Sequence, residues 1–356
     1  MSPVVDAHTH LYPRWYLDRL RDHAGLPRLR GTPGAERLVM FAGEGPDGGR
    51  PIDESYWEVD AKAAFLEREG LDQALVSMGN PWLEPFAGAE SVELAWRFNE
   101  EAAALEAATG GRLCGMGVLP AHDVESAVAV AAHVGRTPQL HGVITGTRLC
   151  GRLLDDPALD PLWQALERDR VPVFLHPHHA VATEELAGFG HASPVGVGFP
   201  FETTVALWRL VLGGVLERFP GLAVLAAHGG GTVPFLAGRM DAAWRSDPSA
   251  QTRLSHPPSE DLARLYLDAV LYHPRAMRAA ADLVGADRML YGTDHPFSVA
   301  DPATNLAAVE DAFPSGELDE VLGGTANRLF DLPPVSGSAG GRPVGRPPVD
   351  CVNGGR

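Results

Sequence analysis

The chain has 356 residues, of which 29 are Lys or Arg and 46 are Asp or Glu, so its formal net charge at pH 7 is −17. Such an acidic surface repels phosphate backbones, which argues against nucleic acid as a partner. The three cysteines, Cys114, Cys150 and Cys351, fit neither a disulfide framework nor a thiolate zinc site, and the N-terminus lacks the pattern of a signal peptide. We therefore expect a cytoplasmic protein with reduced thiols and no membrane partner, since no run of about 18 apolar residues is evident.

Short apolar runs alternate with longer amphipathic stretches along most of the chain. The runs predicted as strands are Val4–His8, Gln73–Met78, Leu113–Leu119, Gly142–Thr145, Pro172–His176, Ala223–His228, Leu265–Val270 and Met289–Gly292. The stretches predicted as helices include Asp60–Glu69, Val92–Thr109, Asp123–Val134, Pro161–Asp169, Glu202–Arg218 and Pro274–Val284. This alternation predicts an α/β fold, a (β/α)₈ barrel of the TIM type. The alternative is an open doubly wound sheet, but its first strand would be followed by a Gly-rich phosphate loop, and HTHLYP is no such loop.

Two segments fall outside the alternation. The segment Leu11–Tyr56 is rich in Gly, Pro and Arg, and we interpret it as an insertion after the first strand that could lie over the barrel mouth. The segment Pro333–Arg356 is dense in Gly, Pro and Ser and is predicted to be a disordered tail. The metal-dependent barrel is thus expected to occupy residues 1–332.

Ionisable side chains stand at the ends of several predicted strands, which in a barrel open onto one face. His8 and His10 are two residues apart in extended chain, so both imidazoles can reach one ion. His176, His228 and Asp294 end three further strands. A single His-x-His is weak evidence, and one histidine at a strand end is more often a hydrogen-bonded core residue. Their coincidence predicts a site for a divalent ion such as Zn²⁺.

The glycines Gly229–Gly231 follow His228. They are typical of a flexible turn, but they also let the backbone approach a ligand closely. The second interpretation makes His228 an acid or base beside the ion.

These motifs together resemble the amidohydrolase superfamily, and within it the branch of the aminocarboxymuconate-semialdehyde decarboxylases. The resemblance runs from about Val4 to Leu332 and is densest over residues 196–244, which contain AAHGGGTVPF. The motifs DAHTHLYP, VFLHPHH and LYGTDHPF also match in order and approximate position.

The resemblance implies a barrel with one divalent ion, usually zinc and sometimes manganese. Its metal ligands map onto His8, His10, His176 and Asp294, and the catalytic positions onto His228 and Asp294. The substrate-binding positions map onto Arg50, Arg239 and Phe297. Because the second arginine of such enzymes reaches into the neighbouring subunit, the resemblance also implies a homodimer that shares Arg239.

Lysine is nearly absent from the chain, since Lys62 is the only one. The predicted fourth strand has no lysine, which excludes a two-metal site bridged by a carboxylated lysine and leaves a single ion. One departure from the family lies after the fifth strand, where the chain reads His176-Pro177-His178-His179. We expect this departing stretch to line the substrate side of the pocket.

The favoured function is a metal-dependent, non-oxidative decarboxylation of a small unsaturated or aromatic carboxylic acid. The ion would act as a Lewis acid, His228 would move a proton, and the arginines would hold the anionic substrate. Activity should fall below about pH 6, where the histidine ligands protonate. One alternative is a mononuclear hydrolase of a lactone, ester or amide, and another is a barrel that only binds a ligand. A substrate panel scored for CO₂ release against ring opening would separate the two enzymes.

Overall fold

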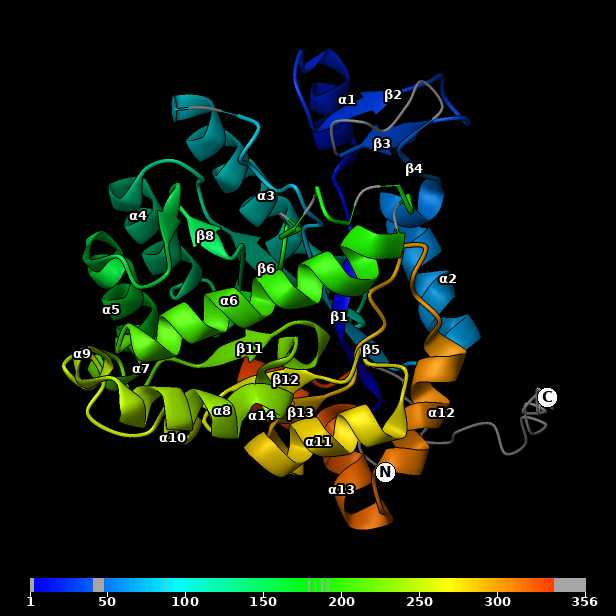
Figure 1. Ribbon diagram of the computed structural model, residues 1–356. Helices are drawn as coiled ribbons and strands as arrows, with labels where there is room; N and C mark the ends of the chain where they lie inside the picture. The colour runs from blue at the N-terminus through cyan, green and yellow to red at the C-terminus, as the bar shows by residue number, and fades with distance from the viewer. Residues whose placement is uncertain are drawn as a thin grey trace.

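The structure is a computed structural model that describes residues 3–40, 48–86, 88–178, 180–182, 184–186, 188–190 and 192–335. Eight parallel strands form its main sheet in the order β1-β5-β6-β7-β10-β11-β12-β13 (Figure 1). They are β1 (Val5–His10), β5 (Gln73–Ser77), β6 (Leu113–Val118), β7 (Leu140–Thr145), β10 (Val173–Leu175), β11 (Val224–Ala226), β12 (Tyr266–Asp268) and β13 (Met289–Leu290). Each strand lies at one of the predicted runs, and β1 extends two residues further, so that it includes both His8 and His10.

The last strand returns to the first. Ala7 N–H donates to the Tyr291 carbonyl at 2.9 Å, and Asp294 N–H donates to the His8 carbonyl at 2.8 Å. Gly292 makes this approach possible, because a Cβ there would lie 2.6 Å from the Cβ of His8. The sheet is therefore a barrel of the TIM type, as predicted, and its seam runs beside the histidines of β1.

Helices cover the outside of the strands (Figure 1). The main ones are α2 (Val59–Glu69), α3 (Gly88–Ala108), α4 (Val124–Val134), α5 (Asp160–Arg168), α6 (Phe199–Leu212), α8 (Val233–Ser246), α11 (Pro274–Val284) and α12 (Pro302–Ala312). Shorter ones are α7 (Val215–Arg218), α9 (Pro248–Gln251), α10 (Pro258–Leu262), α13 (Ser315–Asp319) and α14 (Thr325–Phe330). The prediction of one helix over Glu202–Arg218 is wrong, because Gly214 adopts a φ of +70° and separates α6 from α7.

The segment between β1 and α2 contains regular structure. It includes helix α1 (Arg14–Asp22) and an antiparallel sheet of β2 (Arg28–Arg30), β3 (Arg37–Val39) and β4 (Arg50–Pro51). A carboxylate at its centre, Glu36, accepts hydrogen bonds from Arg14 and Arg21, and these charges lower the pKa of Glu36. That this segment is an insertion stays a prediction. The predicted tail, Pro333–Arg356, lies outside the described residues from 336 onward.

Among the described residues, one helical stretch of 19 residues, Pro194–Leu212, is by length and composition apolar enough to cross a membrane, with a mean hydropathy of 1.3 over an 18-residue window. It is not an unbroken apolar run, because it contains Glu202 and Arg209, so the absence of a membrane partner stays a prediction. Two of its polar side chains bind neighbouring segments of the chain. Glu202 accepts a hydrogen bond from Thr147, and Arg209 donates one to Asp155 at 2.6 Å. The stretch therefore packs in the structure as one of the helices around the barrel.

Candidate metal centre

Five side chains meet at the C-terminal ends of the strands. Nε2 of His8 lies 3.2 Å from Asp294 Oδ1, and Nε2 of His10 lies 3.3 Å from the same oxygen. The potential ligand atoms of His8, His176, His228 and Asp294 all lie within 4.8 Å of one another. The structure thus brings together every residue that the sequence placed at or beside the ion.

The outer nitrogen of three of these rings is already bound to an acceptor. The partners are Asp268 Oδ2 at 2.6 Å from His8 Nδ1, Ser77 Oγ at 2.9 Å from His10 Nδ1, and the Pro177 carbonyl at 2.7 Å from His176 Nδ1. Since Ser77 donates its own proton to the Thr9 carbonyl, it accepts from His10. Each ring therefore carries its proton on Nδ1 and turns Nε2 inward, which is the tautomer that binds metals.

A positive charge at the centre of the cluster would be stabilised by the atoms around it. Nε2 of His8 and Nε2 of His10 are only 3.1 Å apart, so two lone pairs would face one another there. Nε2 of His176 and Oδ1 of Asp294 are buried and have no hydrogen-bond partner. Three imidazole nitrogens and one carboxylate oxygen are a donor set that suits a borderline divalent ion. The residues present therefore fit a single bound metal.

Burial and the nearby carboxylates shift the pKa values of two histidines of the cluster. Burial disfavours the imidazolium of His8, yet the carboxylates of Asp294 and Asp268 raise its pKa to about 10. Burial lowers the pKa of His10 to about 4. The two carboxylates therefore favour a positive charge at His8, and a bound ion would supply such a charge.

Sequence reasoning missed Asp268, the last residue of β12. Its Oδ2 accepts from His8 Nδ1 and, at 2.9 Å, from the backbone N–H of His228, and its Oδ1 accepts from Gly229 N–H at 2.9 Å. Burial would raise the pKa of this carboxyl group, but the hydrogen bond from His8 lowers it. The available signal was a single acid in an otherwise apolar run, LYLDAV. Asp268 links a predicted metal ligand to the predicted proton donor.

His228 stands at the edge of the cluster. Its backbone has a φ of +55°, and its Nε2 lies 3.6 Å from Asp294 Oδ2. The side chain is 14% exposed, whereas those of His8 and His10 are fully buried. The glycines after it are required, since a Cβ on Gly231 would lie 2.1 Å from the Pro200 carbonyl oxygen. This turn therefore holds His228 at the boundary between the cluster and the space in front of it.

That space is a cavity of about 90 Å³, lined by residues that include His176, His228 and Asp294. Arg50 of β4 and Phe297, the two residues predicted to contact substrate within this chain, form part of its wall. The guanidinium carbon of Arg50 lies 4.2 Å from the centre of the Phe297 ring, and Arg50 also donates to Tyr12 Oη at 3.2 Å. One cavity thus joins the metal cluster to a cation and an aromatic surface.

The sequence model of the amidohydrolase family matches residues 5–332. The chain belongs to the amidohydrolase family. The 2-amino-3-carboxymuconate-6-semialdehyde decarboxylase of Dictyostelium discoideum is 27% identical to this amidohydrolase over 343 residues, covering 94% of this chain and 93% of that protein.

Solved structures resemble it in fold. The apo form of Metarhizium anisopliae IDCase has a TM-score of 0.87 and 32% identity, covering 93% of this amidohydrolase and 97% of that chain. A dihydroxybenzoic acid decarboxylase from Polaromonas sp. JS666, bound to manganese and the inhibitor 2-nitroresorcinol, has a TM-score of 0.75 and 20% identity over 93% and 98% of the two chains. Together with the His and Asp cluster, these relationships make the chain a metal-dependent decarboxylase of the amidohydrolase superfamily.

One predicted substrate residue does not reach the cavity of its own chain. Arg239 is exposed on α8 and is absent from the described residues that line the space in front of the cluster. Its predicted role therefore depends on a second subunit.

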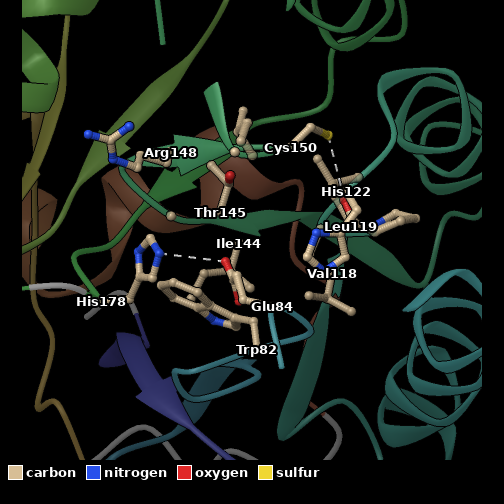
Figure 2. A pocket seen from close by; sticks show the side chains of 15 residues that line it. Trp82, Glu84, Val118, Leu119, His122, Ile144, Thr145, Arg148, Cys150 and His178 are labelled. Atoms are coloured by element: carbon tan, nitrogen blue, oxygen red, sulfur yellow. Dashed lines mark hydrogen bonds and ion pairs between the residues drawn. The ribbon is translucent and has the colours of Figure 1, made fainter. Parts of the chain in front are cut away.

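A second cavity of about 130 Å³ lies beyond Trp82, whose ring is 5.9 Å from that of His176. Figure 2 shows the His178 ring turned toward Glu84, with Nε2 and Oε1 3.7 Å apart. Burial and the charge of Glu202 raise the pKa of Glu84 to about 8. His178 lines this neighbouring cavity and not the one in front of His228, so its place on the substrate side stays a prediction, and His179 lies outside the described residues.

Proposed function

We propose that this amidohydrolase removes CO₂ from a small aromatic or unsaturated carboxylic acid that binds in the cavity in front of His228. The observation that supports this most directly is the placement of Arg50, Phe297 and the metal cluster around one small space. An aromatic or enal acid suits it, because the Phe297 ring offers an apolar face and Arg50 offers a planar fork for a carboxylate or phenolate.

His228 is the proposed proton donor. When the bond between the ring or chain carbon and the carboxylate breaks, its electron pair passes into the conjugated system of the substrate. The same carbon then takes a proton from the His228 imidazolium. One carboxylate anion and one proton thus yield CO₂ and the decarboxylated product. Asp294 Oδ2, 3.6 Å from His228 Nε2, stabilises the protonated ring before the transfer.

The remaining residues orient the reactants. Asp268 fixes the His228 backbone, and Arg50 offsets the repulsion between an anionic substrate and an acidic protein. His8, His10, His176 and Asp294 would hold the ion, which when bound supplies Lewis acidity to a substrate oxygen.

We propose zinc as that ion, because three imidazoles and one carboxylate match its preferred donors. Manganese is the competing candidate, supported by the manganese-bound Polaromonas relative. Metal analysis of protein purified without added metals, followed by reconstitution with each ion in turn, would decide between them. Higher turnover per bound Mn²⁺ than per bound Zn²⁺ would overturn the choice of zinc.

We further propose a homodimer in which Arg239 enters the partner's cavity. Large apolar side chains are exposed beside it on α8 and α6, notably Phe235 at 88% and Val205 at 50%. A dimer interface would cover them. Mixing an Arg239→Ala protein with a His228→Ala protein tests this: hybrid dimers regain activity if the arginine acts across the interface, and they do not if each site uses its own.

The decisive test of the function is a CO₂-release screen of metal-loaded protein with muconate and hydroxybenzoate acids. Release that is abolished by His228→Ala while metal content is retained would support the proposal. Ring opening of lactones, without CO₂ from any acid, would favour the hydrolase instead. We also propose a cytoplasmic location, which is supported by free Cys114 and Cys150 and can be tested by cell fractionation.

A further inference from the structure

Lys62 differs from every other cation of the chain. It is the only lysine among 29 basic residues, and its side chain is fully buried on α2. A buried ammonium loses its hydration, and this burial lowers the pKa of Lys62 to about 7. An aliphatic side chain would fill the same space without that cost, so the ammonium calls for an explanation.

The contacts of Lys62 lie directly behind the metal cluster. Its Nζ donates to Thr9 Oγ1 at 2.8 Å and to His295 Nδ1 at 2.5 Å, and it lies 3.3 Å from the His295 carbonyl oxygen. Thr9 stands between the ligands His8 and His10 on β1. Because side chains alternate along a strand, it faces away from the ion, toward α2.

The second partner, His295, directly follows Asp294. Its carbonyl accepts from Thr9 Oγ1 at 2.9 Å and from His10 N–H at 2.8 Å, and its ring stacks on Phe65 of α2 at 3.7 Å. One ammonium therefore binds two of the three chain segments that carry predicted ligands, at the seam where β1 meets the end of β13.

We propose that Lys62 is a positioning residue of the metal centre, which fixes the Asp294–His295 segment against β1 so that the carboxylate stays in reach of His8 and His10. The inference rests on the proposed metal site but concerns ion affinity rather than the substrate. Residues that orient metal ligands typically contribute roughly 10–100-fold to affinity.

The test compares Lys62→Met with Leu66→Ala. Leu66 is a buried residue of the same helix, and the structure gives its side chain no polar contact, so its truncation controls for lost stability. Binding of Zn²⁺ and Mn²⁺ to the folded apoprotein is measured by chelator competition, alongside thermal unfolding. We expect a loss of affinity of roughly 10–100-fold for Lys62→Met and less than about twofold for Leu66→Ala.

Equal affinity of the two variants would overturn the inference and make Lys62 a stabilising residue only. If Lys62→Met does not fold, Thr9→Val and Thr9→Ser take its place. Thr9→Ser, which keeps the hydroxyl group, should bind the ion as the natural chain does, and Thr9→Val should lose affinity; no difference between them overturns the role. A natural chain that binds no ion would instead refute the metal centre itself.

Discussion

Replacement of Asp268 by asparagine should disrupt the metal centre without removing any atom that faces the ion. Four donors converge on this carboxylate: His8 Nδ1 at 2.6 Å, the N–H groups of His228 and Gly229 at 2.9 Å each, and the N–H of Val270 at 3.1 Å. An asparagine offers one acceptor oxygen, so in either orientation its NH₂ group faces two of the four donors. Two buried donors left unpaired cost about 2–6 kcal/mol of stability.

The orientation that keeps Gly229 and Val270 satisfied turns the NH₂ group toward His8. The ring must then accept on Nδ1 and carry its proton on Nε2, which points at the ion. We expect a loss of metal affinity of roughly 10–100-fold, or about 1.4–2.7 kcal/mol.

The assay is chelator-competition titration of the purified variant, with Asp261→Asn as the matched control. Asp261 is equally buried, but it lies on the outer helix α10 and pairs with Arg264 at 2.6 Å. An Asp268→Asn protein that binds the ion within about twofold of this control would refute the tautomer argument.

Three further outcomes follow from the same contacts. Chelation should abolish CO₂ release, and readdition of one divalent ion should restore it; activity that survives full removal of the metal contradicts the site. Arg50→Lys should raise KM roughly 10–100-fold more than it lowers kcat, because the planar fork is lost; steady-state kinetics with an unchanged KM would exclude substrate contact. Glu84 has a folded pKa of about 8 against an ordinary 4.5, so its native-state penalty grows as pH rises from about 4.5 to 8. Urea unfolding of Glu84→Gln should match the natural chain near pH 5 and show about 1 kcal/mol more stability near pH 8.5, a discounted value because the side chain is 32% exposed. An equal difference at both pH values would count against a raised pKa.

The barrel and its metal cluster were predictable because both depend on local patterns. Apolar runs at strand spacing marked all eight strands, and ligand-type residues at their ends marked His8, His10, His176 and Asp294. Because the parallel strands of a barrel end on one face, the sequence predicts that these residues lie close together.

The residues that support the cluster were not predictable in this way. Asp268 binds His8, 260 positions away, and Lys62 binds Thr9, 53 positions away, so no local spacing reveals these contacts. The break between α6 and α7 depends on the left-handed backbone conformation of Gly214. The sequence does not reveal this break, because a glycine inside an amphipathic pattern can also adopt the φ of a helix. The sequence also does not show which of two adjacent cavities His178 lines, because that depends on contacts such as the one with the Trp82 ring, 5.0 Å away.

The seam between β1 and β13 has a consequence for how the enzyme matures in the cell. His8 and His10 leave the ribosome well before Asp294, which lies 284 residues after His10 in the sequence. At about 5–20 residues per second, the interval is on the order of 15–60 s. During that time the growing polypeptide lacks the carboxylate of Asp294 and so has no complete set of the predicted ligands. We therefore expect the ion to bind only after Asp294 has been synthesised, and a translation product that stops before the final strand to lack the complete site.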